Sequence, residues 1–430
     1  EGPGVHVARL VLENFRLYPQ LEMQFRPGLT IIVGPNASGK TSLLEAMHLL
    51  ATSKSPRTHL DRRLIRWDQP YCRAEGSFVS SGGDATSIAL GISANGAGDN
   101  GTPPKQMWLD GVPTSRVSDI IGHVSVVMFT GEDLDLVKGP PQVRRRFLNV
   151  ALSQLRPRYL DDSQRYRRAL DQRNAVLKQI RDRVATTASL EPWTRQLAQA
   201  GAAIAVDRAE FLNTLSEAAD ITHGTLSDEK EELGLQYRSD MGAASSTEEA
   251  QAAFEQALEA AVDRDCESGF TSVGPHRDDF DIRINGTAAR TYGSQGQQRT
   301  AALSLKLAQA DVALAWRGEP PLLLLDDCLS ELDDCRCARV LEMTSVVDGL
   351  IITSPLLTDQ LAARTDAQFF HIDGGTVRLP RLIGLSRALD PLLPRPRSTK
   401  LPALGTGLHK SGNAGARPRE KFIAPPSLPK

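Results

Sequence analysis

The sequence predicts an α/β fold in which a mixed sheet with flanking helices is interrupted by an inserted helical arm. Three observations support this prediction. Short apolar strands alternate with amphipathic helices in residues 1–135 and again in residues 267–385. Between them, residues 136–266 are rich in Ala, Leu, Arg, Glu and Gln at helical spacing. A glycine-rich turn at residues 34–41 joins an expected strand to an expected helix. The outer segments should therefore share one sheet.

The N-terminal segment contains most of the expected strands. They are expected where apolar residues alternate or run together, at 7–12, 21–25, 30–33, 72–80, 87–92 and 124–129. Residues 107–112 form an expected hairpin with Asp-Gly at its tip. A helix is expected at 41–50, and the Gly-, Asn- and Pro-rich residues 93–104 predict a mobile loop.

The arm should hold two or three long helices, with breaks near residues 186–191 and 239–246. Strands then return at 280–284, 321–326, 350–354 and 368–372. A helix over 296–316 should bury one face, formed by Leu303, Leu307, Ala310 and Leu314. Residues 386–430 are rich in Pro and in basic residues and predict a disordered tail.

Residues 34–41 match G-x-x-x-x-G-K-[ST], the phosphate-binding P-loop. Backbone N–H groups of such a loop and the following helix N-terminus attract phosphate oxygens. Lys40 is expected to be exposed in the empty loop and to reach the β- and γ-phosphates of ATP. The Thr41 hydroxyl should bind Mg²⁺. The candidate nucleotide-binding residues are Gly34, Pro35, Asn36, Ala37, Ser38, Gly39, Lys40 and Thr41.

The apolar residues 322–325 end in two carboxylates, Asp326 and Asp327. Alone this pattern is ambiguous, because many strands end in acidic residues. Downstream of a P-loop it predicts that Asp326 holds Mg²⁺ together with Thr41. Asp327 should then orient or deprotonate the attacking water, which makes it a catalytic candidate beside Lys40.

Four residues just before that strand resemble the signature motif of ABC-type ATPases: Ser294, Gln295, Gly296 and Gln297. A serine hydroxyl and free N–H groups at a helix start can bind a γ-phosphate, so Ser294 is the third catalytic candidate. A flexible polar turn is the alternative interpretation. Ser330 and Asp333 stand where a D-loop follows. These motifs in this order predict an ABC-type head.

The interval between Lys40 and Ser294 distinguishes the subfamilies. A transporter subunit has a much shorter helical insert there, and SMC proteins have hundreds of residues of coiled coil; this chain is intermediate. The alternatives are a nucleotide-binding subunit of an ABC transporter, another SMC-like ATPase, or an ATPase–nuclease with a Toprim domain. The last needs a further block of acidic metal ligands, which the basic tail does not supply.

The chain resembles the RecF family of bacterial replication and recombination-repair ATPases. Gly-Pro-His-Arg-Asp-Asp at 274–279 and Asp-Asp-Cys-Leu-Ser-Glu-Leu-Asp at 326–333 are the most specific matches. Other matching segments are 14–16, 34–41, 44–46, 55–57, 64–66, 132–134, 137–139, 144–148 and 293–297. The P-loop differs at Ala37, Ser38 and Ser42, and Thr353 stands at the place of a transporter's switch histidine.

This resemblance implies an ATP-dependent clamp that dimerises on ATP, binds double-stranded, gapped or junction DNA, and hydrolyses ATP slowly. RecR and RecO are the implied partners in loading RecA. The candidate DNA-binding residues are Arg57, Arg144, Arg145 and Arg146. Clustered arginines can neutralise DNA phosphates, although a solvated helix face is an equal alternative because acidic residues interleave. No stretch is long and apolar enough for a membrane span, and a cytoplasmic location is expected.

Overall fold

The computed structural model describes residues 4–94, 105–242, 246–345 and 347–378. The expected loop at 93–104 lies almost entirely outside these residues, and the expected tail at 386–430 lies entirely outside them. None of the described helices is both long and apolar enough to cross a membrane.

The central sheet has six strands in the order β15-β14-β3-β13-β12-β8, and its inner pairs are parallel. Only the edge strand β15 runs antiparallel, against β14. The strands are β3 (Gly28–Val33), β8 (Val126–Phe129), β12 (Leu322–Leu325), β13 (Gly349–Ser354), β14 (Gln368–Asp373) and β15 (Thr376–Arg378). Strands from both outer segments of the sequence therefore alternate in one mixed sheet, which confirms the predicted fold class.

A second sheet is an antiparallel meander from the N-terminal segment, in the order β2-β1-β4-β5-β6-β7. Its strands are β1 (His6–Phe15), β2 (Tyr18–Gln24), β4 (Tyr71–Val79), β5 (Ala85–Ser93), β6 (Lys105–Leu109) and β7 (Val112–Thr114). Helix α1 (Lys40–Thr52) packs on strands of both sheets. As a result, every residue of α1 except Thr41 is buried.

The run of four leucines in β12 is explained by the two faces of the central sheet. Leu322 and Leu324 belong to the core that contains α1 and the antiparallel sheet. Leu323 and Leu325 belong to a second core, formed with the helices on the opposite face. A strand covered on both faces needs apolar residues at every position, not at alternate ones.

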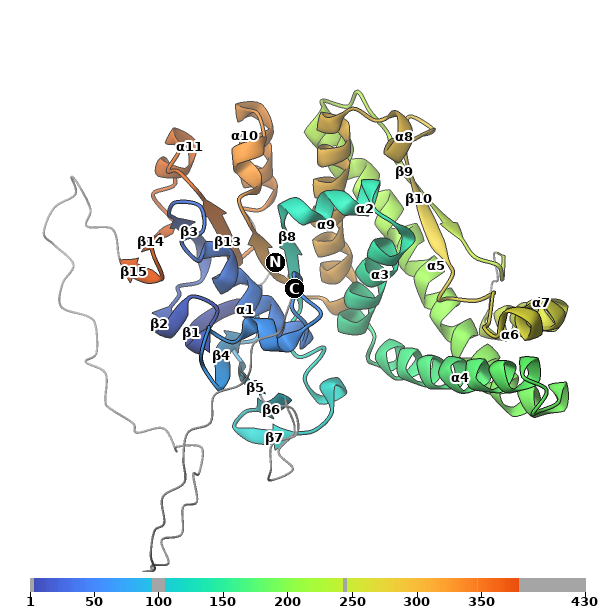
Figure 1. The fold of residues 1–430 in the computed structure, drawn as a ribbon. Helices are drawn as coiled ribbons and strands as arrows, with labels where there is room; N and C mark the ends of the chain where they lie inside the picture. The colour runs from blue at the N-terminus through green and yellow to red at the C-terminus, as the bar shows by residue number, and fades with distance from the viewer. Residues whose placement is uncertain (1–3, 95–104, 243–245, 346, 379–430) are drawn as a thin grey trace, which may run out of the picture. The chain divides into compact units, whose positions relative to one another are not determined.

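The helical segment begins with α2 (Asp135–Lys138), α3 (Pro141–Leu155) and α4 (Pro157–Arg181). It continues with η4 (Thr187–Leu190), α5 (Glu191–Ser227), α6 (Thr247–Ala260) and α7 (Val262–Ser268). Helix α5 has 37 residues, which corresponds to about 56 Å. It packs on α4 and α6 and also on α9 (Gln295–Arg317), which lies against the central sheet (Figure 1). The expected break near 186–191 is present, between α4 and α5. The helix that was expected to break near 239–246 already ends at Ser227. The arm boundaries at 136 and 266 stay a prediction.

Two expectations for this region are wrong. The arm is not wholly helical, because β9 (Leu233–Arg238) pairs with β10 (Asp279–Ile284), which is followed by β11 (Thr287–Ala288). The strand at 280–284 therefore joins a three-stranded sheet of its own and not the central sheet. Leu314 is 43% exposed, while Leu305 and Val312 are buried. Helix α9 packs between α5 and the sheet, so two of its sides are buried instead of one stripe.

Arg144 connects α3 to β10 and is not on the surface. Its side chain is 5% exposed, and its Nε and Nη2 atoms donate to the two carboxylate oxygens of Asp279 at 2.7 and 2.8 Å. Its Nη1 atom donates to the carbonyls of Leu136 and Gly139, both at 3.1 Å. The prediction that Arg144 binds DNA is therefore wrong, because its donors are used inside the protein.

Replacing Arg144 with Ala should lower the free energy of unfolding by about 2 kcal/mol, because Asp279 and two carbonyls lose their donor. Urea denaturation at neutral pH measures this change. The control is Arg168→Ala, whose exposed side chain contacts the Gln164 carbonyl one turn earlier, and its effect should stay within about 0.5 kcal/mol. Equal stability of the two variants would contradict the structural role of Arg144.

Candidate nucleotide-binding site

The P-loop connects β3 to α1, and two glycines are required by its close contacts. A Cβ atom at Gly34 would lie 2.1 Å from the carbonyl oxygen of Ile372. Gly39 has a φ of +113°, and a Cβ there would lie 2.6 Å from the Tyr18 hydroxyl. That hydroxyl donates to the Gly39 carbonyl at 3.1 Å. The loop therefore contacts a neighbouring strand and a tyrosine too closely for a side chain at either glycine.

The carbonyl and the hydroxyl of Ser38 differ in whether they have a hydrogen-bond partner in the described part of the chain. The Ser38 carbonyl accepts a hydrogen bond from Gly375 N at 3.1 Å, in the turn between β14 and β15. The Ser38 hydroxyl is buried and has no hydrogen-bond partner among the described residues. Ala37 lies in the left-handed region, with a φ of +64°. A buried hydroxyl without a partner is costly, so a phosphate oxygen would satisfy it.

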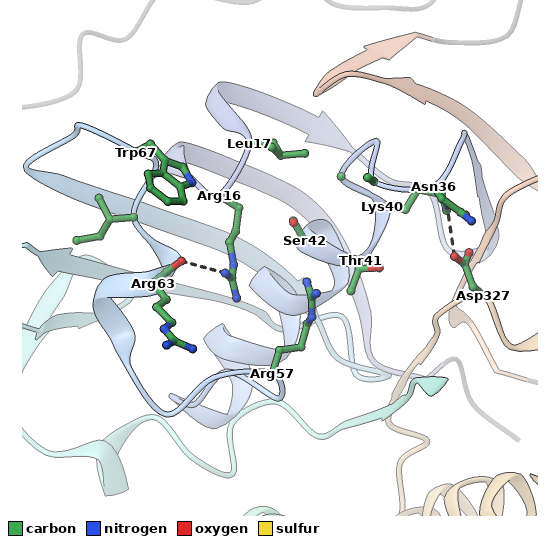
Figure 2. Close-up of a pocket in the computed structure, with 13 residues that line it drawn as sticks. Arg16, Leu17, Asn36, Lys40, Thr41, Ser42, Arg57, Arg63, Trp67 and Asp327 are labelled. Carbon is green, nitrogen blue, oxygen red and sulfur yellow. Dashed lines mark hydrogen bonds and ion pairs between the residues drawn. The ribbon is translucent and has the colours of Figure 1, made fainter. Parts of the chain in front are cut away.

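Lys40 is 3% exposed, so the expectation of an exposed lysine is wrong. Its ammonium donates to the carbonyls of Gly34 at 2.9 Å and Pro35 at 3.3 Å. It also lies 3.6 Å from the Asp327 carboxylate (Figure 2). Two carbonyls of the loop accept hydrogen bonds from the ammonium of Lys40, and these bonds keep a positive charge inside the curve of the P-loop.

The ends of β12 and β13 meet at the two aspartates. The Thr353 hydroxyl donates to Asp326 Oδ1 at 2.7 Å and accepts from the backbone N–H of Asp327 at 2.9 Å. Asp327 has a φ of +50°, which turns the chain away from the strand. Thr353 therefore fixes the orientation of both acidic residues. It stands at the place of a transporter's switch histidine.

Burial raises the pKa of the Asp326 carboxyl above its ordinary value. Hydrogen bonds from the hydroxyls of Thr353 and Thr41 and the charge of Lys40 oppose this shift, while the charge of Asp327 adds to it. Thr41 and Asp326 thus offer two adjacent oxygen donors from the ends of different elements. Mg²⁺ typically takes one or two protein oxygens and completes its shell with phosphate and water, so this donor set fits the predicted ion.

A pocket of about 580 Å³ lies beside the P-loop. Figure 2 shows Trp67, Arg63 and Arg57 on one side of it and the P-loop with Asp327 on the other. The lining residues are Arg16, Leu17, Asn36, Ala37, Gly39, Lys40, Thr41, Ser42, Arg57, Arg63, Ile65, Trp67 and Asp327. Sequence reasoning missed Trp67 and Arg63 as pocket residues.

Arg16 is held in the pocket wall by a buried carboxylate. Its Nε and Nη2 atoms donate to Glu45 at 2.8 and 2.6 Å. Glu45 lies on α1, is fully buried and also accepts from the Ser55 hydroxyl at 2.6 Å. The Ser55 hydroxyl in turn accepts from the backbone N–H of Arg57 at 3.1 Å. One carboxylate therefore organises both arginine-bearing walls of the pocket.

The signature residues lie elsewhere. Ser294 caps α9, its hydroxyl accepting from Gln297 N at 3.2 Å and its N–H donating to Gln297 Oε1 at 2.7 Å. Ser294, Gln295 and Gly296 are exposed, and among the described residues that line the pocket none belongs to the signature. The structure therefore does not bring Ser294 to Lys40 within this chain.

The predicted D-loop residues follow Asp327 directly. Ser330 donates its hydroxyl to the Asp327 carbonyl at 2.7 Å. Asp333 caps α10 (Asp334–Met343) by accepting from Arg336 N at 2.9 Å. Both residues are therefore placed by the turn that ends β12.

The remaining candidate DNA-binding arginines do not form one cluster. Arg57 is exposed and lines the pocket. Arg145 donates to the Asp278 carbonyl at 2.7 Å, and Arg146 donates to the Ser55 carbonyl at 2.6 Å. Arg146 thus connects α3 to the loop that carries Arg57.

The P-loop after β3, the paired aspartates after β12 and the capped signature helix define an ABC-type ATPase head. A family model described as "RecF/RecN/SMC N terminal domain" matches residues 6–354. The Smc head domain of Pyrococcus furiosus covers 87% of this chain with a TM-score of 0.50, and its 16% identity indicates a shared fold alone.

Two curated relatives narrow this class. The DNA replication and repair protein RecF of Halalkalibacterium halodurans is 41% identical over 339 residues, which are 78% of this chain and 89% of that protein. RecF of Bacillus subtilis is 40% identical over 359 residues, which are 80% of this chain and 95% of that protein. A solved structure of the recombination mediator protein RecF-ATP in the RecFOR pathway has a TM-score of 0.80 and 31% identity, and covers 88% of this chain and 98% of that one. The chain belongs to the RecF family.

Replacing Asp326 with Asn should stabilise the protein at neutral pH. Because the pKa of Asp326 is raised by burial, the folded state binds its proton more tightly than the unfolded state, and stability falls as pH rises through the interval between the ordinary and the raised pKa. Asn carries no charge at any pH. The variant's gain in free energy of unfolding should therefore appear as pH rises through that interval and vanish at more acidic pH. Urea denaturation across a pH series measures it, and a gain that is the same at every pH would contradict the assignment.

Proposed function

We propose that this chain is an ATP-dependent DNA-binding clamp of recombinational repair and replication restart, in which slow ATP hydrolysis resets the clamp. One observation carries the proposal: the pocket beside the P-loop and the exposed signature serine occur on the same head but in different places. Two heads are then needed to complete one site. The structure of a relative with bound ATP supports the choice of nucleotide.

In this proposal the triphosphate binds in the P-loop. The loop N–H groups, the Ser38 hydroxyl and Lys40 hold the phosphate oxygens, with the α1 N-terminus adding its dipole. Thr41 and Asp326 hold Mg²⁺, which when bound neutralises phosphate charge. Trp67 and Arg63 are left to contact the nucleoside, which extends away from Lys40.

Asp327 is the group that handles the attacking water. Its carboxylate is 35% exposed and lies 3.6 Å from the Lys40 ammonium, so it stands beside any phosphate that Lys40 binds. A carboxylate at this position can orient water and accept its proton. Ser294 of a second protomer supplies the γ-phosphate contact that a single head lacks, and ATP is therefore bound between two copies of the chain.

DNA is the proposed macromolecular ligand, in double-stranded, gapped or junction form, and it should stimulate the weak ATPase. RecO and RecR are the proposed partners because a related protein is described within the RecFOR pathway, and loading of RecA is the proposed outcome. Arg57, Arg145 and Arg146 remain candidates for phosphate contact, since Arg57 is exposed and the other two are only half-buried.

Mixing two inactive variants tests the composite site. Lys40→Ala should lose nucleotide binding, and Ser294→Arg should bind ATP but lose dimerisation and hydrolysis. A heterodimer of the two has one site with both defects and one intact site. ATPase activity should therefore reappear on mixing, or ATP-dependent dimerisation should partly recover if hydrolysis needs two filled sites; size-exclusion chromatography and phosphate release measure both. Recovery of neither would place Ser294 outside any shared site.

DNA binding should be stimulated by ATP and fall steeply with salt. If three or four phosphates are neutralised, raising salt from 50 to 200 mM should lower the affinity on the order of 100-fold. At saturating ATP, Arg57→Ala should lower the slope of log affinity against log salt by about 1, while Arg144→Ala leaves the slope unchanged. Fluorescence anisotropy with gapped and blunt duplexes measures these slopes. An affinity independent of salt would indicate a ligand other than nucleic acid.

A further inference from the structure

The signature loop is fixed by a carboxylate outside the sequence motif. Gln297 accepts from Ser294 N with its side-chain oxygen and donates from Nε2 to Glu231 Oε1 at 2.8 Å. Glu231 lies in the connection between α5 and β9. Since a carboxylate only accepts, Glu231 allows one orientation of the Gln297 amide, the orientation whose oxygen faces Ser294.

Glu231 is itself held from the buried side. His223, on α5 and fully buried, lies with Nε2 3.1 Å from Glu231 Oε2 and with Nδ1 3.2 Å from the Ser304 hydroxyl. Ser304 is on α9, the helix that begins at the signature. A chain of polar contacts thus runs from the start of α9, through Glu231 and His223, back to α9 two turns later.

The same end of α5 also holds the helix that follows the D-loop. Arg336 on α10 donates to the Leu226 carbonyl at 3.3 Å and lies 3.4 Å from the carboxylate of Asp333. Arg339, also on α10, forms an ion pair with Asp228, the C-cap of α5. The last turn of α5 and the residues after it therefore contact both the signature helix α9 and helix α10, which follows the D-loop residues.

We propose that Glu231 is a positioning residue for ATP hydrolysis, which acts by fixing the signature loop of its own protomer for the nucleotide bound by the other protomer. This inference rests on the proposed function, because it needs a site shared between two chains. Glu231 does not line the pocket beside its own P-loop, so its removal should leave nucleotide binding by the single chain unchanged.

The first test separates turnover from binding. Glu231→Ala should lower kcat for ATP about tenfold, as expected when a hydrogen bond to a charged group is lost, with KM unchanged. Glu231→Gln keeps the size of the side chain, but its amide can both donate and accept and so tolerates either orientation of the Gln297 amide; its rate should therefore stay well below that of the unaltered protein. The matched control is Glu232→Ala, the exposed neighbouring glutamate, which should behave as the unaltered protein. A raised KM, or a full rate with Glu231→Gln, would contradict positioning by the carboxylate.

The second test shows in which protomer Glu231 acts. Mixed with Lys40→Ala, Glu231→Ala should regain activity, because the heterodimer has one site with an intact P-loop and an intact signature. Mixed with Ser294→Arg it should not, because both sites then have a damaged signature. The opposite pattern would mean that Glu231 serves its own protomer's P-loop. The mixture of Lys40→Ala with Ser294→Arg is run alongside as a control. If this control mixture recovers neither activity nor dimerisation, the shared site itself is overturned. If the control recovers but Glu231→Ala does not regain activity with Lys40→Ala, only the inference about Glu231 is overturned.

Discussion

The burial of α1 between two sheets is the constraint on which the nucleotide site depends. Because the central sheet and the antiparallel meander both pack on this helix, its first turn is fixed relative to the end of β3. Only six residues are left to connect them, and they must pass over Ile372 and Tyr18 at distances that exclude a Cβ at Gly34 or Gly39. The phosphate-binding shape of the loop thus follows from the packing around it.

Two carboxylates near the nucleotide site, Glu45 and Asp326, are buried, and burial of a charge costs stability unless partners compensate it. Glu45 on α1 is fully buried, and its charge is compensated by Arg16 and the Ser55 hydroxyl, which fixes the pocket wall. Asp326 is compensated less completely, since burial dominates and its pKa is raised. An under-compensated carboxylate has the most to gain from a cation, and Asp326 is the carboxylate that we propose as a ligand of Mg²⁺.

Local patterns predicted most of the head, while features set by distant partners were missed. The P-loop, its strand and helix, and the buried strand before Asp326 each have a pattern within a few residues. Nothing local indicates that Arg144 faces Asp279 from another element, or that Lys40 is enclosed by its own loop. β9 was missed because its alternating residues lie in a segment whose composition is helical. The contact between Gln297 and Glu231 joins positions far apart in sequence, so no motif could contain it.

A carboxylate is better suited than an apolar contact to holding the signature. Apolar packing against Gln297 would leave its amide free to rotate, and in one of its two orientations an NH₂ group would face the Ser294 N–H. Glu231, 20% exposed and braced by buried His223, excludes that orientation without covering the serine. Because α5 packs on α4 and α6 as well as on α9, the residue that orders the signature is attached to the helix that also forms the arm.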